Sequence, residues 1–360
     1  MAKKGIGIIG YGGFGEFIAK AWNQMDNARV VAVCDSDPNR NPGAGVAFYT
    51  NVDDFLTDKS VDIVSIATPP SSHKDLAIKT LRAGKHALVE KPLALTVEDA
   101  QEIKRVSEET GKLATVNFVI RWNPLVEMLK EIVDAQVLGK LRRVDLRNYA
   151  MQDTVPEGHW FWDPKVSGRI FLEHGVHFFD LASWMIESPA KDACAMTVER
   201  KPGMEDRVFA SIKYENGVIG TFWHSFSRPR ELETTTFHFA FDLGEIEVVG
   251  WIPLELGIWG WTNEAGLGKI EELLEGNEVV VDPVEPHKAH SSEFDYDVEY
   301  ELNTVVEMGD EKLDVYAQSI RAVMADFIEA IDNPAHKMRI TIDNAIEAVR
   351  TAEMATKAVK

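Results

Sequence analysis

The chain has 360 residues, more than a single hydrophobic core usually serves, so its length predicts two domains. Hydrophobic residues make up 45% and charged residues 27%, which is typical of a folded protein and excludes a disordered or collagenous chain. The 58 acidic and 38 basic side chains give a net charge of -20, so nucleic acid and anionic membranes are not expected partners.

Two sequence features bear on the compartment. Cys34 and Cys194 are the only cysteines, too few for a disulfide framework, and neither lies in a CxxC motif or a Cys/His cluster. The apolar run after Lys4 is broken by glycines and is too short for a signal sequence or a membrane span. A cytoplasmic location is therefore expected.

The first part of the chain alternates short β-branched runs with helical patterns. Strands are predicted at residues 4–9, 30–35, 61–67, 86–90 and 113–119, and helices at residues 14–25, 72–83 and 97–110. This alternation predicts an α/β fold with a parallel, doubly wound sheet of the Rossmann type. Thr96 with Asp99 three residues later resembles a capping box and marks the start of the third helix.

The rhythm changes after residue 142. Strands are predicted at residues 206–214, 217–226, 234–241, 245–249 and 278–282, and helices at residues 170–186 and 315–331. Asn216-Gly217 predicts a type I′ turn between the first two of these strands. We therefore expect a Rossmann domain over residues 1–123 and an α+β domain with a large, mainly antiparallel open sheet over residues 124–340. Residues 341–360 read as an amphipathic helix that packs back onto the first domain.

A glycine-rich motif directly follows the first predicted strand and opens a helix. Its spacing is GxGxxG, and Asp35 follows about twenty residues later at the end of the second strand. Glycines let backbone N–H groups approach a pyrophosphate, and an acid at that strand end accepts from a ribose hydroxyl. The cofactor-binding residues that the motif predicts are Gly10, Gly12, Gly13, Phe14, Gly15 and Asp35.

The cofactor is expected to be NAD, because the charge of Asp35 disfavours a 2′-phosphate. Residues 36–45 are too rich in Pro, Gly and Asn for the helix that normally follows the second strand, so a loop is expected there. Arg40 lies on that loop, where it is either a solvated charge or a partner for the 2′-phosphate of NADP.

Three later segments carry a resemblance to a known family. They are ATPPSSH at residues 67–73, AGKHALVEKPLA at residues 83–94 and GRIFLEHGVHFFDL at residues 168–181. The sequence resembles the Gfo/Idh/MocA oxidoreductases, named after glucose-fructose oxidoreductase and inositol dehydrogenase. The resemblance implies a nicotinamide-dependent enzyme that oxidises or reduces a carbinol or ketone of a sugar or cyclitol. It also implies a homodimer or homotetramer formed through the C-terminal sheet.

Lys91 follows the end of a parallel strand, which is where open α/β sheets bind ligands. A cation there stabilises the alkoxide that develops as hydride leaves, so Lys91 is a predicted catalytic and substrate-binding residue. Glu90 is expected to orient this lysine, and Pro92 to stiffen the turn. Cofactor contacts that the resemblance implies are Thr68, Pro69, His73, Glu90 and Lys91.

The predicted helix at residues 170–186 places Glu173, His177 and Asp180 on one face. His177 matches the family's catalytic histidine, and its unperturbed pKa predicts an oxidation rate that rises with pH near neutrality. Glu173 stands where the family usually has Asp, and His174 is an addition that faces substrate or core. The same side chains suit a metal ion, but no metal is expected because Lys91 already serves the reacting oxygen.

The remaining predicted substrate-binding residues come from two loops. The aromatic loop includes His159, Trp160 and Asp163, which suit a sugar ring and its hydroxyls, or else fix the loop by burying its tryptophans. Arg121 leaves the last Rossmann strand towards the domain junction. The expected function is an NAD(P)-dependent dehydrogenase or reductase. The alternatives are a non-catalytic dinucleotide-binding regulator and a glycosidase or epimerase that uses bound NAD transiently.

Overall fold

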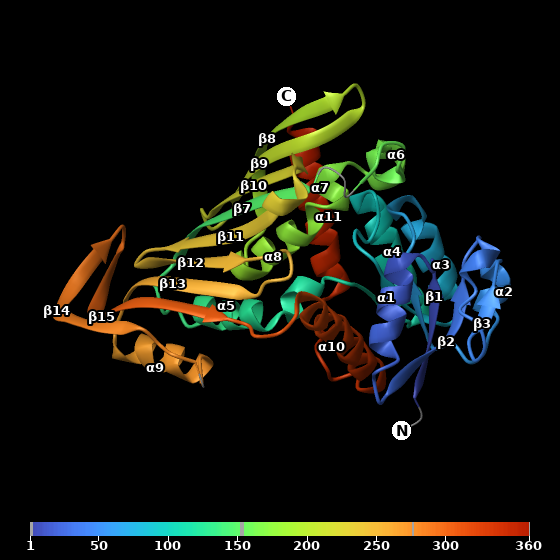
Figure 1. Cartoon of the computed structure of the whole chain (residues 1–360), viewed down its shortest axis with the longest axis horizontal. Coiled ribbons are helices and arrows are strands. Elements are labelled where there is room, and N and C mark those ends of the chain that lie inside the picture. Colours follow the sequence, from blue (N-terminus) through green and yellow to red (C-terminus); the bar gives the residue numbers. More distant parts are fainter. Residues whose placement is uncertain (1–2, 152–154, 276, 360) are drawn as a thin grey trace. The chain divides into compact units, whose positions relative to one another are not determined.

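The computed structural model describes residues 3–151, 155–275 and 277–359, and the chain divides into two compact units. The first unit comprises Met1–Val119, Glu157–Asp180 and Tyr316–Glu353, and the second comprises Ile120–Pro156, Leu181–Val315 and Met354–Lys360. Figure 1 draws the elements of both units in colours that follow the sequence.

The first unit is built on a six-stranded parallel sheet with the order β3-β2-β1-β4-β5-β6. The strands are β1 Lys4–Ile9, β2 Ala28–Cys34, β3 Ala47–Tyr49, β4 Ile63–Ile66, β5 His86–Val89 and β6 Ala114–Val116. Their aliphatic side chains are almost fully buried, as in Ile6, Val64 and Leu88, because helices lie on the sheet faces. This sheet confirms the predicted Rossmann arrangement.

The helices that follow these strands are α1 Gly13–Trp22, α2 Val52–Leu56, α3 His73–Arg82 and α4 Val97–Thr110. The Thr96 hydroxyl accepts the Asp99 backbone N–H at 3.1 Å, so the predicted cap of α4 is confirmed. Between β2 and β3 the described chain forms only a short 3-10 turn at Pro38–Arg40, which confirms the predicted loop.

Most of two late helices belongs to the first unit, which includes Tyr316–Glu353. Helix α10 (Lys312–Asp332) and helix α11 (Ile342–Lys357) agree with the helices predicted at residues 315–331 and 341–360, although Lys360 lies outside the described residues. The fully buried Trp22 of α1 donates its indole N–H to the Ile320 carbonyl at 3.3 Å. Thr115 of β6 donates to the Ile340 carbonyl at 2.7 Å. Residues more than 200 positions apart thus share one core.

The single helix predicted at residues 170–186 is wrong. Two helices stand there, α7 (Ile170–Glu173) and α8 (Val176–Ile186), after the short α6 (Pro164–Ser167). The Gly175 N–H bonds to the Ile170 carbonyl at 2.8 Å, one residue beyond helical spacing. A Cβ on Gly175 would lie 2.6 Å from the Phe171 carbonyl oxygen, so glycine permits the tight break. Glu173 and His177 therefore do not share one continuous helical face.

The second unit holds a nine-stranded sheet with the order β14-β15-β13-β12-β11-β7-β10-β9-β8. Among the described strands of this sheet only the β7–β10 pair is parallel, which confirms a mainly antiparallel sheet. The strands are β7 Leu141–Met151, β8 Ala190–Lys201, β9 Met204–Tyr214, β10 Ile219–Arg228, β11 Thr234–Phe241, β12 Gly244–Val249, β13 Glu255–Thr262, β14 Val281–Ser291 and β15 Phe294–Glu307. Helices α5 (Pro124–Asp134) and α9 (Glu264–Leu273) belong to the same unit.

Two details of this sheet differ from the sequence-based expectation. The β9–β10 turn is not type I′, because Gly217 has a φ of +90° whereas Asn216 is not among the residues with positive φ. The Gly217 N–H bonds to the Tyr214 carbonyl at 3.0 Å, which indicates a type I turn followed by a left-handed glycine. The strand predicted at residues 278–282 is shifted, since β14 runs over Val281–Ser291.

The faces of the nine-stranded sheet differ in exposure. Phe237, Phe239 and Ile246 are at most 2% exposed on one face. Large apolar side chains on the other face keep much of their surface exposed, namely Met196, Trp259, Trp261 and Val305. No helix of the described residues is both long and apolar enough to span a membrane.

Candidate active site

The turn after β1 needs its glycines for two different reasons. Gly10 has a φ of +92°, and a Cβ there would lie 2.4 Å from the Ala67 carbonyl oxygen. A Cβ on Gly15 would lie 2.3 Å from the Gly10 carbonyl oxygen, so glycine allows α1 to approach β1 closely. A Cβ on Gly13 would meet no atom within 4 Å. The first turn of α1 is thus open to an anion at its backbone N–H groups.

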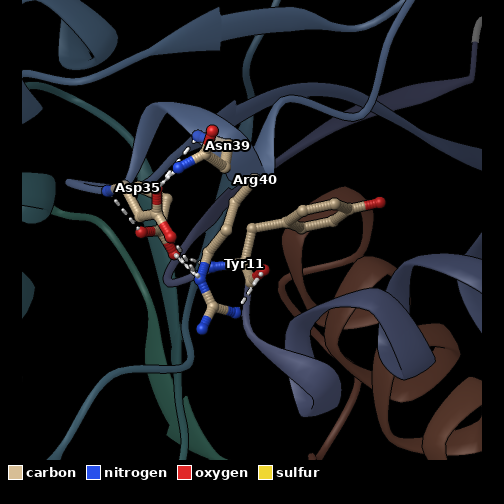
Figure 2. A network of polar contacts seen from close by, with 5 residues as sticks. Tyr11, Asp35, Asn39 and Arg40 are labelled. Carbon is tan, nitrogen blue, oxygen red and sulfur yellow. Dashed lines mark hydrogen bonds and ion pairs between the residues drawn. The ribbon is translucent and has the colours of Figure 1, made fainter.

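Asp35, directly after β2, is held against this turn. One carboxylate oxygen accepts the Tyr11 backbone N–H at 2.7 Å, and the other accepts the Asp37 N–H at 2.9 Å. Figure 2 shows the Asp35 carboxylate directed towards the start of the glycine-rich turn. An acid so placed, beside an open helix N-terminus, fits the ribose and pyrophosphate of a dinucleotide.

Arg40 reaches the same turn from its loop. Figure 2 shows the Arg40 side chain extending from the loop into the space between the Asp35 and Tyr11 residues. The guanidinium donates to the Tyr11 carbonyl at 3.1 Å and lies 3.9 Å from an Asp35 oxygen. A Cβ on Gly12, the N-cap of α1, would lie 3.0 Å from the same guanidinium. Arg40 thus shares the glycine-rich turn with Asp35, and 42% of its side chain remains exposed.

His73 connects two loops at the carboxyl ends of the strands. Its ring is fully buried, and its nitrogens lie 2.8 Å from the Thr68 carbonyl oxygen and 2.6 Å from the Pro92 carbonyl oxygen. Burial lowers the pKa of the His73 imidazole, although both carbonyls oppose that shift. The Thr68 hydroxyl lies 2.6 Å from the Ser72 hydroxyl, and Pro69 precedes the short turn there. The loop after β4 is thereby tied to the turn that contains Lys91.

Lys91 forms an ion pair with Glu173 rather than with Glu90. Its ammonium lies 2.6 Å from a Glu173 carboxylate oxygen and 2.7 Å from the Glu173 backbone oxygen. The side chains of Lys91 and Glu173 are only 18% and 11% exposed. Since Glu173 ends α7 just before the helix break, one residue supplies both acceptors. The expectation that Glu90 orients Lys91 is therefore wrong, because Glu173 holds the Lys91 ammonium.

Glu90 has different partners. Its carboxylate accepts the Asn117 side-chain N–H at 2.7 Å and the backbone N–H of Lys91. Burial raises the pKa of Glu90 to about 7, although the Asn117 bond and the Lys91 charge oppose the shift. Burial also raises the pKa of Tyr316 on α10, with a smaller contribution from the charge of Glu90. The Tyr316 ring lies 6.3 Å from that of Phe14 in the first turn of α1.

His177 is the second residue of α8, the helix after the break, and is 6% exposed. Burial lowers the pKa of its imidazole well below the ordinary value of 6.5, and the Lys91 charge adds to the shift. Its ring contacts the edge of Phe118 with centroids 6.1 Å apart. The imidazole is therefore neutral at neutral pH. The expected rise of the oxidation rate with pH moves from near neutrality to more acid pH. His174 lies in the break between α7 and α8, and its ring centroid is 5.4 Å from that of Phe178.

The other predicted substrate-binding residues lie in different surroundings. The His159 and Trp160 rings lie 5.0 Å apart in the first unit, and the Asp163 carboxylate accepts the Lys165 N–H at the start of α6. Arg121 belongs to the second unit, where it is 2% exposed and lies 5.3 Å above the Trp184 ring. The structure therefore does not bring Arg121 into the first unit with Lys91 and His177.

Sequence reasoning missed two side chains at this site. Asn117 directly follows β6, and the strand end was a signal that could have identified it. Tyr316 comes from α10, far from Glu90 and Asn117 in the sequence, and nothing in the sequence marks it. As for metals, the described parts of the chain contain no group of three His, Cys, Asp or Glu side chains able to hold an ion.

Family models match both parts of the chain. The Gfo/Idh/MocA oxidoreductase family model, described as an NAD-binding Rossmann fold, matches residues 4–118. The model of the Gfo/Idh/MocA C-terminal domain matches residues 126–247. The chain therefore belongs to the Gfo/Idh/MocA family of oxidoreductases, as the sequence motifs indicated.

Named relatives share part of the sequence. The chain is 29% identical over 227 residues to inositol 2-dehydrogenase 2 of Saccharopolyspora erythraea, which covers 59% of this chain and 64% of that protein. It is 27% identical over 227 residues to the NAD(+)-dependent scyllo-inositol 2-dehydrogenase of Bacillus subtilis, with the same two coverages. The matches thus span just under two thirds of the length of these curated relatives.

The fold also matches solved structures. The WlbA dehydrogenase of Bordetella pertussis, in complex with NADH and UDP-GlcNAcA, superimposes with a TM-score of 0.78 at 18% identity. The match covers 99% of this chain and 95% of that one. At this identity the likeness establishes the fold alone.

Proposed function

We propose that the protein is an NAD(H)-dependent oxidoreductase that acts on a carbinol or ketone of a sugar, cyclitol or related polyol. The observation that carries this proposal is the Lys91–Glu173 pair, which lies in the same unit as the glycine-rich turn and His177. A charged donor and a neutral imidazole are the groups that alcohol oxidation requires. The names of the inositol dehydrogenase relatives support a polyol substrate.

Each polar group has one role in this proposal. The bound nicotinamide supplies the hydride acceptor or donor. The Lys91 ammonium, held by Glu173, donates to the substrate oxygen and stabilises its developing negative charge. His177, kept neutral by burial, accepts the hydroxyl proton during oxidation and returns it during reduction. His159 and Trp160 offer a polar edge and an aromatic face to the substrate ring.

We expect NAD to bind at least about tenfold more tightly than NADP, because the Asp35 charge repels a 2′-phosphate. Calorimetric titration with both cofactors measures the ratio. Asp35→Asn should reduce the preference, whereas the control Asp37→Asn, which keeps the bond from Tyr11 to Asp35, should retain it. Equal or tighter NADP binding by the wild type would mean that Arg40 outweighs Asp35.

Lys91→Ala should lower the maximal rate by about 10² or more, because the alkoxide loses its charged donor. Its affinity for NAD should change little, since the ammonium acts on the substrate oxygen. Lys74→Ala is the matched control, because Lys74 pairs with Asp99 and Glu102 and not with Glu173. A loss of NAD affinity as large as the loss of rate would instead make Lys91 a cofactor ligand.

His177→Ala should lower the maximal rate by about 10² or more. Only the neutral imidazole accepts a proton, so the maximal rate of oxidation by the wild type should rise with pH through a pKa well below 6.5. At higher pH, His177 should cause no further increase in this rate. That acid limb should be absent from the pH profile of the variant. Near-normal turnover, or an unchanged limb, would assign the base to another group.

We further propose that the protein forms a homodimer or homotetramer through the open face of the nine-stranded sheet. Trp259 and Trp261 are 39% and 40% exposed there, and such an apolar patch supports a protein interface. Sedimentation velocity should give an assembly that Trp259→Glu weakens, and a wild-type monomer would contradict the proposal.

We also propose that the protein is cytoplasmic, because its two cysteines are too few for a disulfide framework.

A further inference from the structure

The strand order assigns the two halves of a dinucleotide to different strand ends. The glycine-rich turn follows β1, and Asp35 follows β2 on one side of it. Strands β4, β5 and β6 lie on the other side of β1. If the pyrophosphate binds at the turn and the adenosine ribose at Asp35, the nicotinamide half extends over the ends of β4, β5 and β6. Glu90 and Asn117 are the residues that directly follow β5 and β6.

Within the described part of the chain, Glu90 forms no ion pair. The nearby Lys91 ammonium is bonded to Glu173, whose carboxylate balances its charge. The groups that face Glu90 are the Asn117 amide, the Lys91 backbone N–H and charge, and the Tyr316 phenol. The Glu90 side chain is enclosed by these elements but not fully buried. Burial raises its pKa to about 7, so both protonation states are available at neutral pH.

Asn117 is suited to a carboxyl group that changes its protonation state. Its side-chain N–H donates to Glu90 at 2.7 Å, which serves the ionised form. Its side-chain oxygen is buried and has no hydrogen-bond partner among the described residues. Rotating the amide by half a turn would present that oxygen to Glu90, where it would accept the proton of a neutral carboxylic acid. The amide can therefore satisfy Glu90 in either state.

We propose that Glu90 senses the oxidation state of the nicotinamide: it gives up its proton against the cationic ring of NAD+ and keeps the proton it holds against the neutral ring of NADH. This inference rests on the proposed function, because it requires a nicotinamide over the end of β5. The protons balance: where free Glu90 is protonated, NAD+ binding releases one proton to solvent and NADH binding releases none, and where free Glu90 is already ionised, neither cofactor releases a proton. The negative charge of ionised Glu90 thus favours binding of the oxidised cofactor. The Asn117 amide stabilises Glu90 in either protonation state.

The sign of the pH dependence follows from this linkage. Below about pH 7 the free site holds the proton, so NAD+ must displace it and binds more weakly. As the pH rises through that value the affinity for NAD+ increases and then levels. NADH carries no ring charge and gains nothing from ionised Glu90. The ratio of the NAD+ and NADH dissociation constants should therefore fall by about tenfold between about pH 6 and pH 8.5, as expected for one opposite charge in a partly buried site.

The test is calorimetric titration of the full chain with NAD+ and with NADH at these pH values. Repeating each titration in two buffers of different ionisation enthalpy counts the protons released. The wild type should release close to one proton on binding NAD+ near pH 6 and close to none near pH 8.5. Glu90→Gln keeps the shape of the side chain and should abolish both the proton release and the pH dependence. Glu108→Gln, an exposed carboxyl group on α4, is the matched control and should behave as the wild type.

Several outcomes would overturn the inference. Equal pH dependence for NAD+ and NADH would do so, as would proton release that persists in Glu90→Gln. If the variant does not fold, the proton count of the wild type decides, since no release on NAD+ binding near pH 6 contradicts the proposal. Failure of both cofactors to bind would overturn the inference and the proposed function together. Binding with the expected proton release but without turnover of any polyol would contradict only the proposed function.

Discussion

An ammonium that is largely shielded from water needs acceptors, and Lys91 finds two of them on Glu173. The contact joins a turn of the parallel sheet to a helix 82 residues later in the chain. The break at Gly175 makes it possible, because α7 ends at Glu173 and leaves the backbone oxygen of that residue available. A continuous helix would use that oxygen for its own hydrogen bond to residue 177. The position of His177 in a separate helix is thus part of the same arrangement.

The pairing of Lys91 has a second effect on the site. With its charge balanced by Glu173, Lys91 does not fully ionise Glu90, and burial dominates the pKa of that carboxyl group. Adjacent residues at one strand end therefore have separate electrostatic environments, one paired and one not. Glu173 carries one more methylene than the Asp usual in the family, and this longer side chain reaches the ammonium at 2.6 Å.

Local sequence predicted much of the first unit because strand, turn and helix patterns there agree with one another. The glycine spacing, Asp35 and the Thr96 cap each depend on residues close in sequence. The partner of Lys91 could not be predicted in this way, because Glu90 is adjacent in sequence whereas Glu173 is adjacent only in space. Strand β14 was largely missed, since its prolines and charged residues have low strand propensity and lie at the edge of a sheet.

The contacts of Trp22 and Thr115 can form only late in the synthesis of the chain. Both side chains belong to the first 119 residues, yet their carbonyl partners, Ile320 and Ile340, leave the ribosome some 200 residues later. Until then the nascent parallel sheet lacks the helix that covers Trp22, and an apolar surface stays open to water. Helix α1, which follows the glycine-rich turn, therefore acquires its contact with Ile320 only after α10 has been made. Chaperones that bind exposed apolar segments have that interval in which to act.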